Sequence, residues 1–166
     1  VKSCGATHVL LGHSERRHVF NETNEMLKTK LSYCKDAGLI PVLCVGETLA
    51  DREQDKTESV IKQQLSILSG FDGEFMVAYE PVWAIGTGKT ATPEMAQAVH
   101  EFIRNECPEE CVILYGGSVK QANVEGLLHQ SDINGALIGG ASLVAEEFSG
   151  IVSLSNQMAV EKRSVI

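Results

Sequence analysis

The chain alternates short runs of β-forming residues with segments of helical periodicity, and this alternation constrains its fold more than any other feature. The runs span residues 7–12, 40–45, 75–79, 111–115 and 136–138. They show little alternation of polar and apolar residues, as expected for strands that are buried on both faces. Because helical segments separate the runs, we predict an α/β fold with a parallel sheet.

The segments between the runs have the spacing of amphipathic helices. Leu27, Leu31 and Cys34 lie at i, i+4 and i+7, and Gly38 follows where a helix commonly ends. Thr92 followed by Pro93 predicts an N-cap and a first-turn proline. The same i, i+4, i+7 pattern recurs at Ile61, Leu65 and Leu68. Ala96, Val99 and Ile103 give a buried stripe, and a final helical pattern runs through Phe148, Ile151 and Val152.

The length of 166 residues corresponds to just over five βα units of an eight-unit barrel, at about 31 residues a unit. A five-stranded doubly wound sheet fits the length equally well. No linker or charge run marks a second domain, so we treat residues 1–166 as one domain. Val1 is not a start methionine and no signal-peptide layout follows it, so we expect a cut beginning.

Charge and hydropathy exclude several classes of protein. Fourteen basic and 22 acidic side chains give a net charge of -8, which predicts no binding to nucleic acid. No apolar run reaches the roughly 18 residues of a membrane span, so we expect no membrane partner. The five cysteines are an odd number, and Cys107 with Cys111 has no second close pair for zinc. We therefore expect reduced thiols in a cytoplasmic protein, a buried Cys44 and no metal site.

Polar residues gather directly after the predicted strands, where parallel α/β folds carry their functional groups. His13 follows the first strand and Glu80 the third. A carboxylate beside a neutral imidazole is what proton transfer next to a carbonyl requires, because the carboxylate takes the carbon-bound proton and the imidazole donates to the developing enolate oxygen. The alternatives are a structural strand-end histidine for His13, and a solvated loop carboxylate or a helix cap for Glu80.

The segment after Glu80 predicts a lid. A proline and two bulky residues precede small residues that can fold over a ligand, and the segment exceeds the usual two to six residues of a βα loop. An ordinary loop is the alternative. The predicted lid consists of Pro81, Val82, Trp83, Ala84, Ile85, Gly86, Thr87, Gly88, Lys89 and Thr90.

Two glycine pairs predict a phosphate site. Gly116 and Gly117 precede Ser118 after the fourth strand, and Gly139 with Gly140 follows the fifth. Backbone N–H groups at helix starts bind anions, and eight-unit barrels frequently bind phosphate with their last two loops. A single glycine pair usually marks only a turn, so the prediction depends on finding two.

Four segments resemble, in order, the signatures of the triosephosphate isomerase family. They are residues 12–17 (GHSERR), 78–88 (AYEPVWAIGTG), 115–119 (YGGSV) and 139–142 (GGAS). The resemblance covers essentially the whole chain. It implies a partial TIM (β/α)8 barrel with parallel strands that contains the fourth to the eighth βα unit.

The resemblance implies an isomerase of glycolysis and gluconeogenesis that needs no cofactor. Its substrate is a small phosphorylated triose, since the family interconverts dihydroxyacetone phosphate and D-glyceraldehyde 3-phosphate through an enediol. Glu80 would be the base and His13 the neutral electrophile, a pairing for which this family is the standard example, and Glu15 would lie beside the base. The substrate phosphate would be bound by Gly86, Ser118, Gly139 and Gly140.

Further roles come with the resemblance. Trp83 and Ile85 would close the lid against water, and Tyr115 would support the closed lid. Asn21 stands where the family usually has glycine, a tolerable change because asparagine also accepts positive φ. Three basic residues would be structural, with solvated charges as the alternative: Arg16, Arg17 and Lys89.

Two expectations follow from units of the family that the chain lacks. The first unit supplies an asparagine and a lysine to the site, and a positioned donor is worth on the order of 3 kcal/mol of barrier. We do not expect Lys89 or Lys120 to replace that lysine. The third unit supplies the loop that interlocks the family's homodimer, so we expect weak or no activity and no assured homodimer. The alternative is a non-catalytic open barrel that binds phosphate ligands or a complementing partner.

Overall fold

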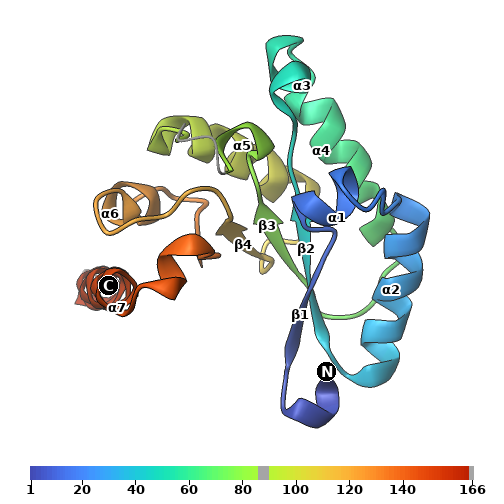
Figure 1. The fold of residues 1–166 in the computed structure, drawn as a ribbon, viewed down its shortest axis with the longest axis horizontal. Coiled ribbons are helices and arrows are strands. Elements are labelled where there is room, and N and C mark those ends of the chain that lie inside the picture. The colour runs from blue at the N-terminus through green and yellow to red at the C-terminus, as the bar shows by residue number, and fades with distance from the viewer. Residues whose placement is uncertain (86–89, 165–166) are drawn as a thin grey trace.

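The computed structural model describes residues 1–85 and 90–164, and these form a curved parallel sheet with helices on its outer side (Figure 1). The strands are β1 (His8–Leu11), β2 (Ile40–Val45), β3 (Met76–Tyr79), β4 (Val112–Tyr115) and β5 (Gly135–Ala136). Their order in the sheet follows the chain, and every neighbouring pair is parallel. This order is that of a barrel that has not closed, whereas a doubly wound sheet reverses its order at one point.

Seven α-helices and four short 3₁₀ turns lie in the described part of the chain. The α-helices are α1 (Ser14–His18), α2 (Asn24–Ala37), α3 (Leu49–Glu53), α4 (Thr57–Leu65), α5 (Pro93–Glu106), α6 (Val124–Leu128) and α7 (Ala145–Ser164). The 3₁₀ turns are η1 (Lys2–Cys4), η2 (Ser66–Leu68), η3 (Val82–Ala84) and η4 (Gly140–Leu143). None of these helices is both long and apolar enough to span a bilayer.

The caps that the sequence predicted are confirmed. Gly38 ends α2 in the left-handed region with a φ of 62°, which glycine adopts at no steric cost. Thr92 starts α5, and its hydroxyl accepts a hydrogen bond from the backbone N–H of Met95 at 3.2 Å. The helical residues predicted to face the sheet are buried in α2 and α5, which fixes both helices against the strands.

The last strand is shorter than predicted. We expected it at residues 136–138, but the ladder contains Gly135 and Ala136. Beyond Ala136, the N–H of Leu137 continues it by donating to the Tyr115 carbonyl at 2.9 Å. Within the described residues β5 pairs with β4 alone. A strand with a neighbour on one side has fewer bonds to hold its extended backbone, so the ladder ends early.

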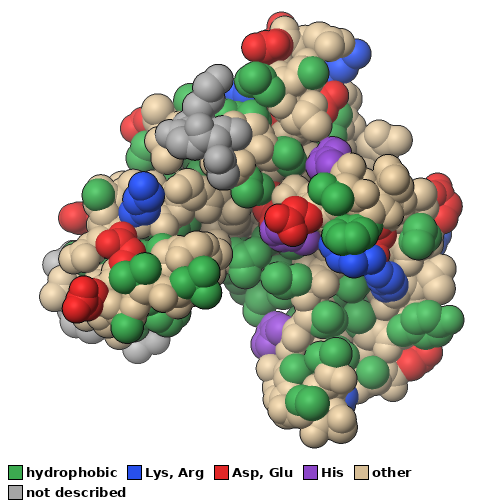
Figure 2. All heavy atoms as spheres, viewed as in Figure 1, with side chains coloured by type: hydrophobic (Ala, Val, Ile, Leu, Met, Phe, Trp, Pro, Cys, Tyr) green, Lys and Arg blue, Asp and Glu red, His purple; other side chains and the backbone are tan. Residues whose placement is uncertain are grey.

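Two apolar groups lie on the two faces of the sheet. The larger one fills the space between the sheet and the helices, and the smaller one lies on the concave face around Val42, Cys44 and Ala78. Cys44 is completely buried there, as predicted. Leu10 of β1 lies in the same inward register as Val42 yet is 45% exposed. Figure 2 shows this face as a hollow with hydrophobic side chains on its floor.

Candidate active site

The carboxyl ends of the strands border one cleft of about 750 Å³. His13 and Glu80 lie on one side of it, and Ser118, Gly139 and Gly140 contribute to its wall. These five residues come from loops after four different strands, and the parallel sheet brings them to the same edge. The structure therefore gathers the residues that the sequence placed in an acid–base pair and a phosphate site.

Glu80 is held at the end of β3 by its backbone. Its N–H donates to the Val45 carbonyl of β2 at 2.7 Å, so the ladder continues to the base itself. A Cβ at the neighbouring Gly46 would lie 1.7 Å from the Glu80 carbonyl oxygen. Glycine is therefore required at position 46 for this close approach of two strands.

The Glu80 carboxylate has three hydrogen-bond donors around it. The backbone N–H of Ser14 donates to Oε2 at 2.8 Å, and Nε2 of His13 lies 3.3 Å from Oε1. The Cys44 thiol also donates to the carboxylate. Burial nevertheless raises the pKa of the Glu80 carboxyl above its ordinary value, against the lowering effect of these contacts. Glu80 is therefore a stronger base than a solvated glutamate.

His13 is positioned by the start of α1. Gly12 turns the chain after β1 with a φ of 71°, and His13 then serves as the N-cap of the helix. Its Nδ1 accepts a hydrogen bond from the backbone N–H of Glu15 at 3.3 Å. A nitrogen that accepts a hydrogen bond carries no proton, so we assign the ring proton to Nε2, which faces Glu80. The imidazole thus presents an N–H donor to the cleft.

Arg17 ties this loop to the sheet. Its guanidinium donates to the carbonyl of Gly12 at 2.9 Å, to Oδ1 of Asn24 at 2.8 Å and to the carbonyl of Cys44 at 3.2 Å. Burial lowers the pKa of Arg17 from its ordinary value. The contacts are those of the structural role that the resemblance implied, and they hold His13 and Cys44 in one frame.

Two further details of this loop agree with the resemblance. Arg16 lies 3.4 Å from the buried carboxylate of Glu22, with its guanidinium over the ring of Phe20. Asn21 has a φ of 54°, the left-handed conformation that asparagine tolerates better than most residues. The replacement of glycine at position 21 therefore keeps the backbone conformation.

Glu15 has a different position from the one that the resemblance implied. Its side chain is exposed. The contact with the site that the structure describes is a hydrogen bond from the backbone N–H of Glu15 to Nδ1 of His13. The neighbour that contacts the base is Ser14, through its backbone. A backbone donor has no sequence signature, so the sequence did not indicate it. A catalytic role for the Glu15 side chain stays a prediction.

The described beginning of the predicted lid is anchored by a buried carboxylate. Glu47 follows β2 and is fully buried. Its Oε1 accepts three hydrogen bonds: from Nε1–H of Trp83 at 2.8 Å, from the hydroxyl of Tyr79 at 3.1 Å and from a guanidinium N–H of Arg52 at 2.9 Å. The Arg52 guanidinium also lies 4.8 Å from the centre of the Trp83 ring. The sequence did not indicate Glu47, because a carboxylate after a strand looks the same whether it is buried or solvated.

Parts of the lid prediction fall outside the structure. Residues 86–89, which include Gly86, lie outside the described residues. On either side of this gap, Ile85 borders the cleft and Thr90 is exposed. The closing of a lid, the phosphate role of Gly86 and the structural role of Lys89 therefore stay predictions.

The two glycine pairs have different surroundings. A Cβ at Gly117 would lie 2.3 Å from the hydroxyl of Tyr115, whereas a Cβ at Gly140 would meet no atom within 4 Å. Tyr115 itself is buried, which raises the pKa of its hydroxyl to about 12. The pair at positions 116 and 117 therefore allows close packing, and the pair at 139 and 140 leaves its backbone open to the cleft.

Lys120, which was not expected to replace the family's lysine, also lines the cleft. Its side chain is exposed, and it lies in the loop that follows Ser118. Within the described ranges no group of three or more histidine, cysteine, aspartate or glutamate side chains is placed to hold a metal ion.

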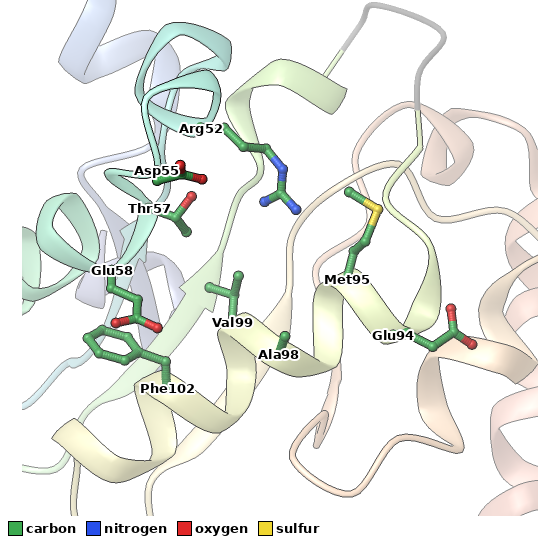
Figure 3. Close-up of a pocket in the computed structure, with 9 residues that line it drawn as sticks. All are labelled: Arg52, Asp55, Thr57, Glu58, Glu94, Met95, Ala98, Val99 and Phe102. Carbon is green, nitrogen blue, oxygen red and sulfur yellow. The ribbon is translucent and has the colours of Figure 1, made fainter.

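A second cavity of about 740 Å³ lies away from these residues. Figure 3 shows it between the α3–α4 region, which contributes Arg52, Asp55 and Glu58, and α5, which contributes Met95 and Phe102. It contains none of the residues that the sequence assigned to catalysis or phosphate binding. Its mixed charges and its position on the outer side of the sheet separate it from the strand ends.

Comparison with known proteins gives one family. The family model described as triosephosphate isomerase matches residues 1–155. Proteins named triosephosphate isomerase are 50% identical over 162 residues in Geobacter metallireducens and 52% identical over 159 residues in Nitrosomonas europaea. A relative with the same name from Legionella pneumophila strain Lens is 50% identical over 167 residues.

The matches cover most of this chain and a smaller share of each relative. They include 90%, 89% and 94% of the chain, but 64%, 63% and 67% of the Geobacter, Nitrosomonas and Legionella proteins. The chain thus spans about two-thirds of their length. With its sequential parallel strands and its His13–Glu80 pair at their carboxyl ends, the chain belongs to the triosephosphate isomerase family.

Proposed function

We propose that this chain carries the proton-transfer centre of an isomerase that interconverts dihydroxyacetone phosphate and D-glyceraldehyde 3-phosphate. One observation carries the proposal: a buried carboxylate of raised pKa faces the N–H of a neutral imidazole at the edge of a cleft. The names and identities of the relatives support the same reaction.

The chemistry follows from the two groups. Glu80 takes a proton from the carbon next to the substrate carbonyl, and Nε2–H of His13 donates to the carbonyl oxygen as negative charge develops there. The resulting enediol is reprotonated on the neighbouring carbon by the same carboxyl. A base of raised pKa suits both steps, because it accepts the proton and returns it near neutral pH.

The substrate phosphate would lie at the opposite wall of the cleft. Gly139 and Gly140 leave the backbone there unobstructed, and Ser118 offers a hydroxyl on the same wall. Lys120 adds a positive charge at the rim, which attracts an anion over the acidic surface of the rest of the chain. We also propose a cytoplasmic location, as for a glycolytic enzyme.

Exchange of substrate protons for deuterium tests the proposal with more sensitivity than net turnover. The chain is incubated with dihydroxyacetone phosphate in D₂O, and the loss of the carbon-bound proton is followed by NMR. We expect slow exchange by the chain alone. Glu80→Gln should lower the rate on the order of 10²- to 10⁴-fold, because it removes the general base. Exchange by this variant at the unaltered rate would exclude Glu80 as the base.

The matched control is Glu94→Gln. Glu94 is an exposed glutamate in the first turn of α5, so this variant loses the same charge away from the base. It should exchange at the rate of the parent chain. An equal loss in both variants would indicate a general effect of net charge, which contradicts the assignment to Glu80.

The second candidate function is docking of a complementing polypeptide onto the open barrel. One observation favours it: on the concave face Leu10 is 45% exposed beside the apolar group around Val42. In the described structure β1 and β5 each pair with one neighbour only, so each offers backbone groups to a further strand. The partner would bring parallel strands whose apolar side chains cover this face.

A mixing experiment separates the two candidates. The part of the Geobacter metallireducens relative that lies outside the match is added as a separate polypeptide, and mass is measured by light scattering together with deuterium exchange. Docking predicts a one-to-one complex that exchanges faster than the chain alone. Exchange by the chain without any complex supports catalysis alone and contradicts docking.

A further inference from the structure

A tight turn with a cysteine at each end joins α5 to β4. Cys107 is the C-cap of α5, and Cys111 directly precedes β4. Within the turn the N–H of Cys111 donates to the Pro108 carbonyl at 3.0 Å, and the N–H of Cys107 donates to the Arg104 carbonyl at 3.4 Å. These backbone bonds hold the two cysteines at a fixed spacing.

The two thiols contact each other. The Cys107 thiol donates a hydrogen bond to the Cys111 sulfur, which makes the two sulfurs neighbours, as a disulfide requires. Cys111 is 6% exposed and Cys107 is partly exposed. A small oxidant therefore reaches the turn from the side of Cys107.

The contacts make the two sulfurs chemically different. The hydrogen bond from Cys107 and the positive charge of Arg104 lower the pKa of the Cys111 thiol, against burial and the nearby charge of Glu110. The hydrogen bond to Cys111, together with burial and Glu106, raises the pKa of Cys107. We therefore assign the thiolate to Cys111, which accepts the hydrogen bond, and the resolving thiol to Cys107, which donates it.

The other three cysteines lack this arrangement. Cys34 and Cys44 are buried, and burial raises the pKa of both thiols. Cys4 is exposed in the turn η1, which precedes β1. Exposure alone would make Cys4 react first, so the order of reaction tests the importance of the paired geometry.

We propose that Cys107 and Cys111 form a dithiol that hydrogen peroxide oxidises to an intramolecular disulfide. The Cys111 thiolate attacks one peroxide oxygen, the O–O bond breaks, and the departing hydroxide takes up a proton to become water. The Cys107 sulfur then attacks the sulfenic sulfur of Cys111. The S–O bond breaks, and the leaving hydroxide takes the Cys107 proton to give a second water. Two thiols are oxidised and one peroxide is reduced.

This inference is independent of the proposed isomerase. The disulfide would connect the end of α5 to the beginning of β4, the strand that leads to Ser118 in the cleft. In a reducing compartment, thiol exchange would return the pair to two thiols. The turn therefore acts as a reversible modification site on the outer end of a strand that leads to the cleft.

Peptide mass spectrometry tests the proposal directly because trypsin separates the cysteines. Cleavage after Arg104 and Lys120 gives a peptide of residues 105–120 that contains both members of the pair and no other cysteine. The remaining cysteines fall in the peptides of residues 3–16, 31–35 and 36–52. The full chain is treated with one equivalent of hydrogen peroxide, unfolded, alkylated with N-ethylmaleimide and digested.

We expect the peptide of residues 105–120 to lose two hydrogen atoms and take up no maleimide, and the other three peptides to be alkylated. Dithiothreitol before alkylation should restore two maleimide groups. Oxidation of Cys4 ahead of the pair, or a pair that gains oxygen atoms irreversibly, would overturn the proposal. Neither result depends on a variant that must fold.

Two variants then test the order of the two sulfurs. In Cys107→Ser the remaining Cys111 has no resolving thiol, so its sulfenic acid should be trapped by dimedone on the same peptide. In Cys111→Ser the thiolate of the remaining Cys107 is still opposed by burial and by the charge of Glu106, so Cys107 should react at least tenfold more slowly than Cys111 does in Cys107→Ser. Faster trapping on Cys107 than on Cys111 would reverse the assignment and contradict the proposed mechanism.

Discussion

The two walls of the cleft are built in opposite ways. On the wall formed after β1 and β3, Glu80 is 2% exposed and hydrogen bonds from a backbone N–H and a thiol fix its carboxylate. On the wall formed after β5, an added Cβ at Gly140 would meet nothing within 4 Å. A proton-transfer group must be held and its pKa adjusted, whereas an anion site needs only unobstructed N–H groups. Substitutions should therefore change rates on the first wall and ligand affinity on the second.

After Glu80→Gln, the largest effect in this comparison is expected from His13→Asn. Asparagine remains a good N-cap for α1 but brings no donor to the position of Nε2. Loss of one donor to the developing oxyanion should lower the deuterium-exchange rate on the order of 10²- to 10³-fold. His129→Asn, on the exposed end of α6, is the matched control. A folded His13 variant with less than a tenfold loss would remove the imidazole from the proposed chemistry.

The next effect is expected at Glu47, which extends the rigid wall into the predicted lid. Glu47→Gln keeps the shape but removes the charge that Arg52, Tyr79 and Trp83 share. We expect unfolding to become easier by about 1–3 kcal/mol, the cost of weakening a buried charge-assisted bond. Trp83 is the single tryptophan of the chain, so urea unfolding followed by its fluorescence reports on this contact.

Glu53→Gln is the control for this substitution. Glu53 is an exposed residue of α3, and its loss of charge should leave the urea midpoint nearly unchanged. If Glu47→Gln also leaves the midpoint unchanged, the buried carboxylate does not hold the start of the lid, and the rigid wall ends at Glu80.

The sequence predicted the first wall in outline because the topology follows from local patterns. Alternating strands and helices predict a parallel sheet, and a parallel sheet places residues that follow its strands at one edge. His13 and Glu80 were therefore expected to meet, and they lie 3.3 Å apart. The helix caps Thr92 and Gly38 could also be predicted, because a cap depends only on neighbours within one helical turn.

The remainder depended on contacts that no local pattern encodes. Glu47 meets Trp83 36 residues away because of the register between β2 and β3, and the Ser14 contact to Glu80 uses the backbone. The two glycine pairs read alike in the sequence. Only their surroundings show that Gly117 packs against Tyr115 and that Gly140 faces open space.

A pair of glycine substitutions sharpens the comparison of the walls. Gly140→Ala should change the free energy of unfolding by less than about 0.5 kcal/mol, since no atom opposes the new methyl group. It should weaken binding of inorganic phosphate roughly tenfold, about 1.4 kcal/mol, because the methyl group occupies the space of the ligand. Thermal unfolding and a phosphate titration by calorimetry measure the two quantities.

Gly117→Ala serves as the counterpart. Its methyl group would lie 2.3 Å from the Tyr115 hydroxyl, so we expect overpacking to destabilise the chain by about 1–3 kcal/mol. If Gly140→Ala destabilises the chain as much and leaves phosphate binding unchanged, the second wall is a packing element and not an anion site.

The smallest effect is a shift of the pH profile by Cys44→Ala. Glu80 acts as a base only when ionised, so exchange should fall as the pH decreases through its pKa, which burial holds above the ordinary value. The Cys44 thiol lowers this pKa by donating to the carboxylate. Removing the thiol should move the falling limb to higher pH. Cys34→Ala, a buried cysteine in α2, should leave the limb in place.

The pH dependence of stability tests the raised pKa of Glu80 independently of exchange. Between the ordinary pKa of a glutamate and the raised pKa of Glu80, the folded chain binds more protons than the unfolded chain. The contribution of Glu80 to stability therefore decreases as the pH rises through this window, and Glu80→Gln should remove that slope. Two results would contradict this account: a shift of the pH profile to lower pH in Cys44→Ala, or an unchanged pH dependence of stability in Glu80→Gln. Either would mean that burial does not set the pKa of Glu80, and that the two walls of the cleft do not differ in the way proposed.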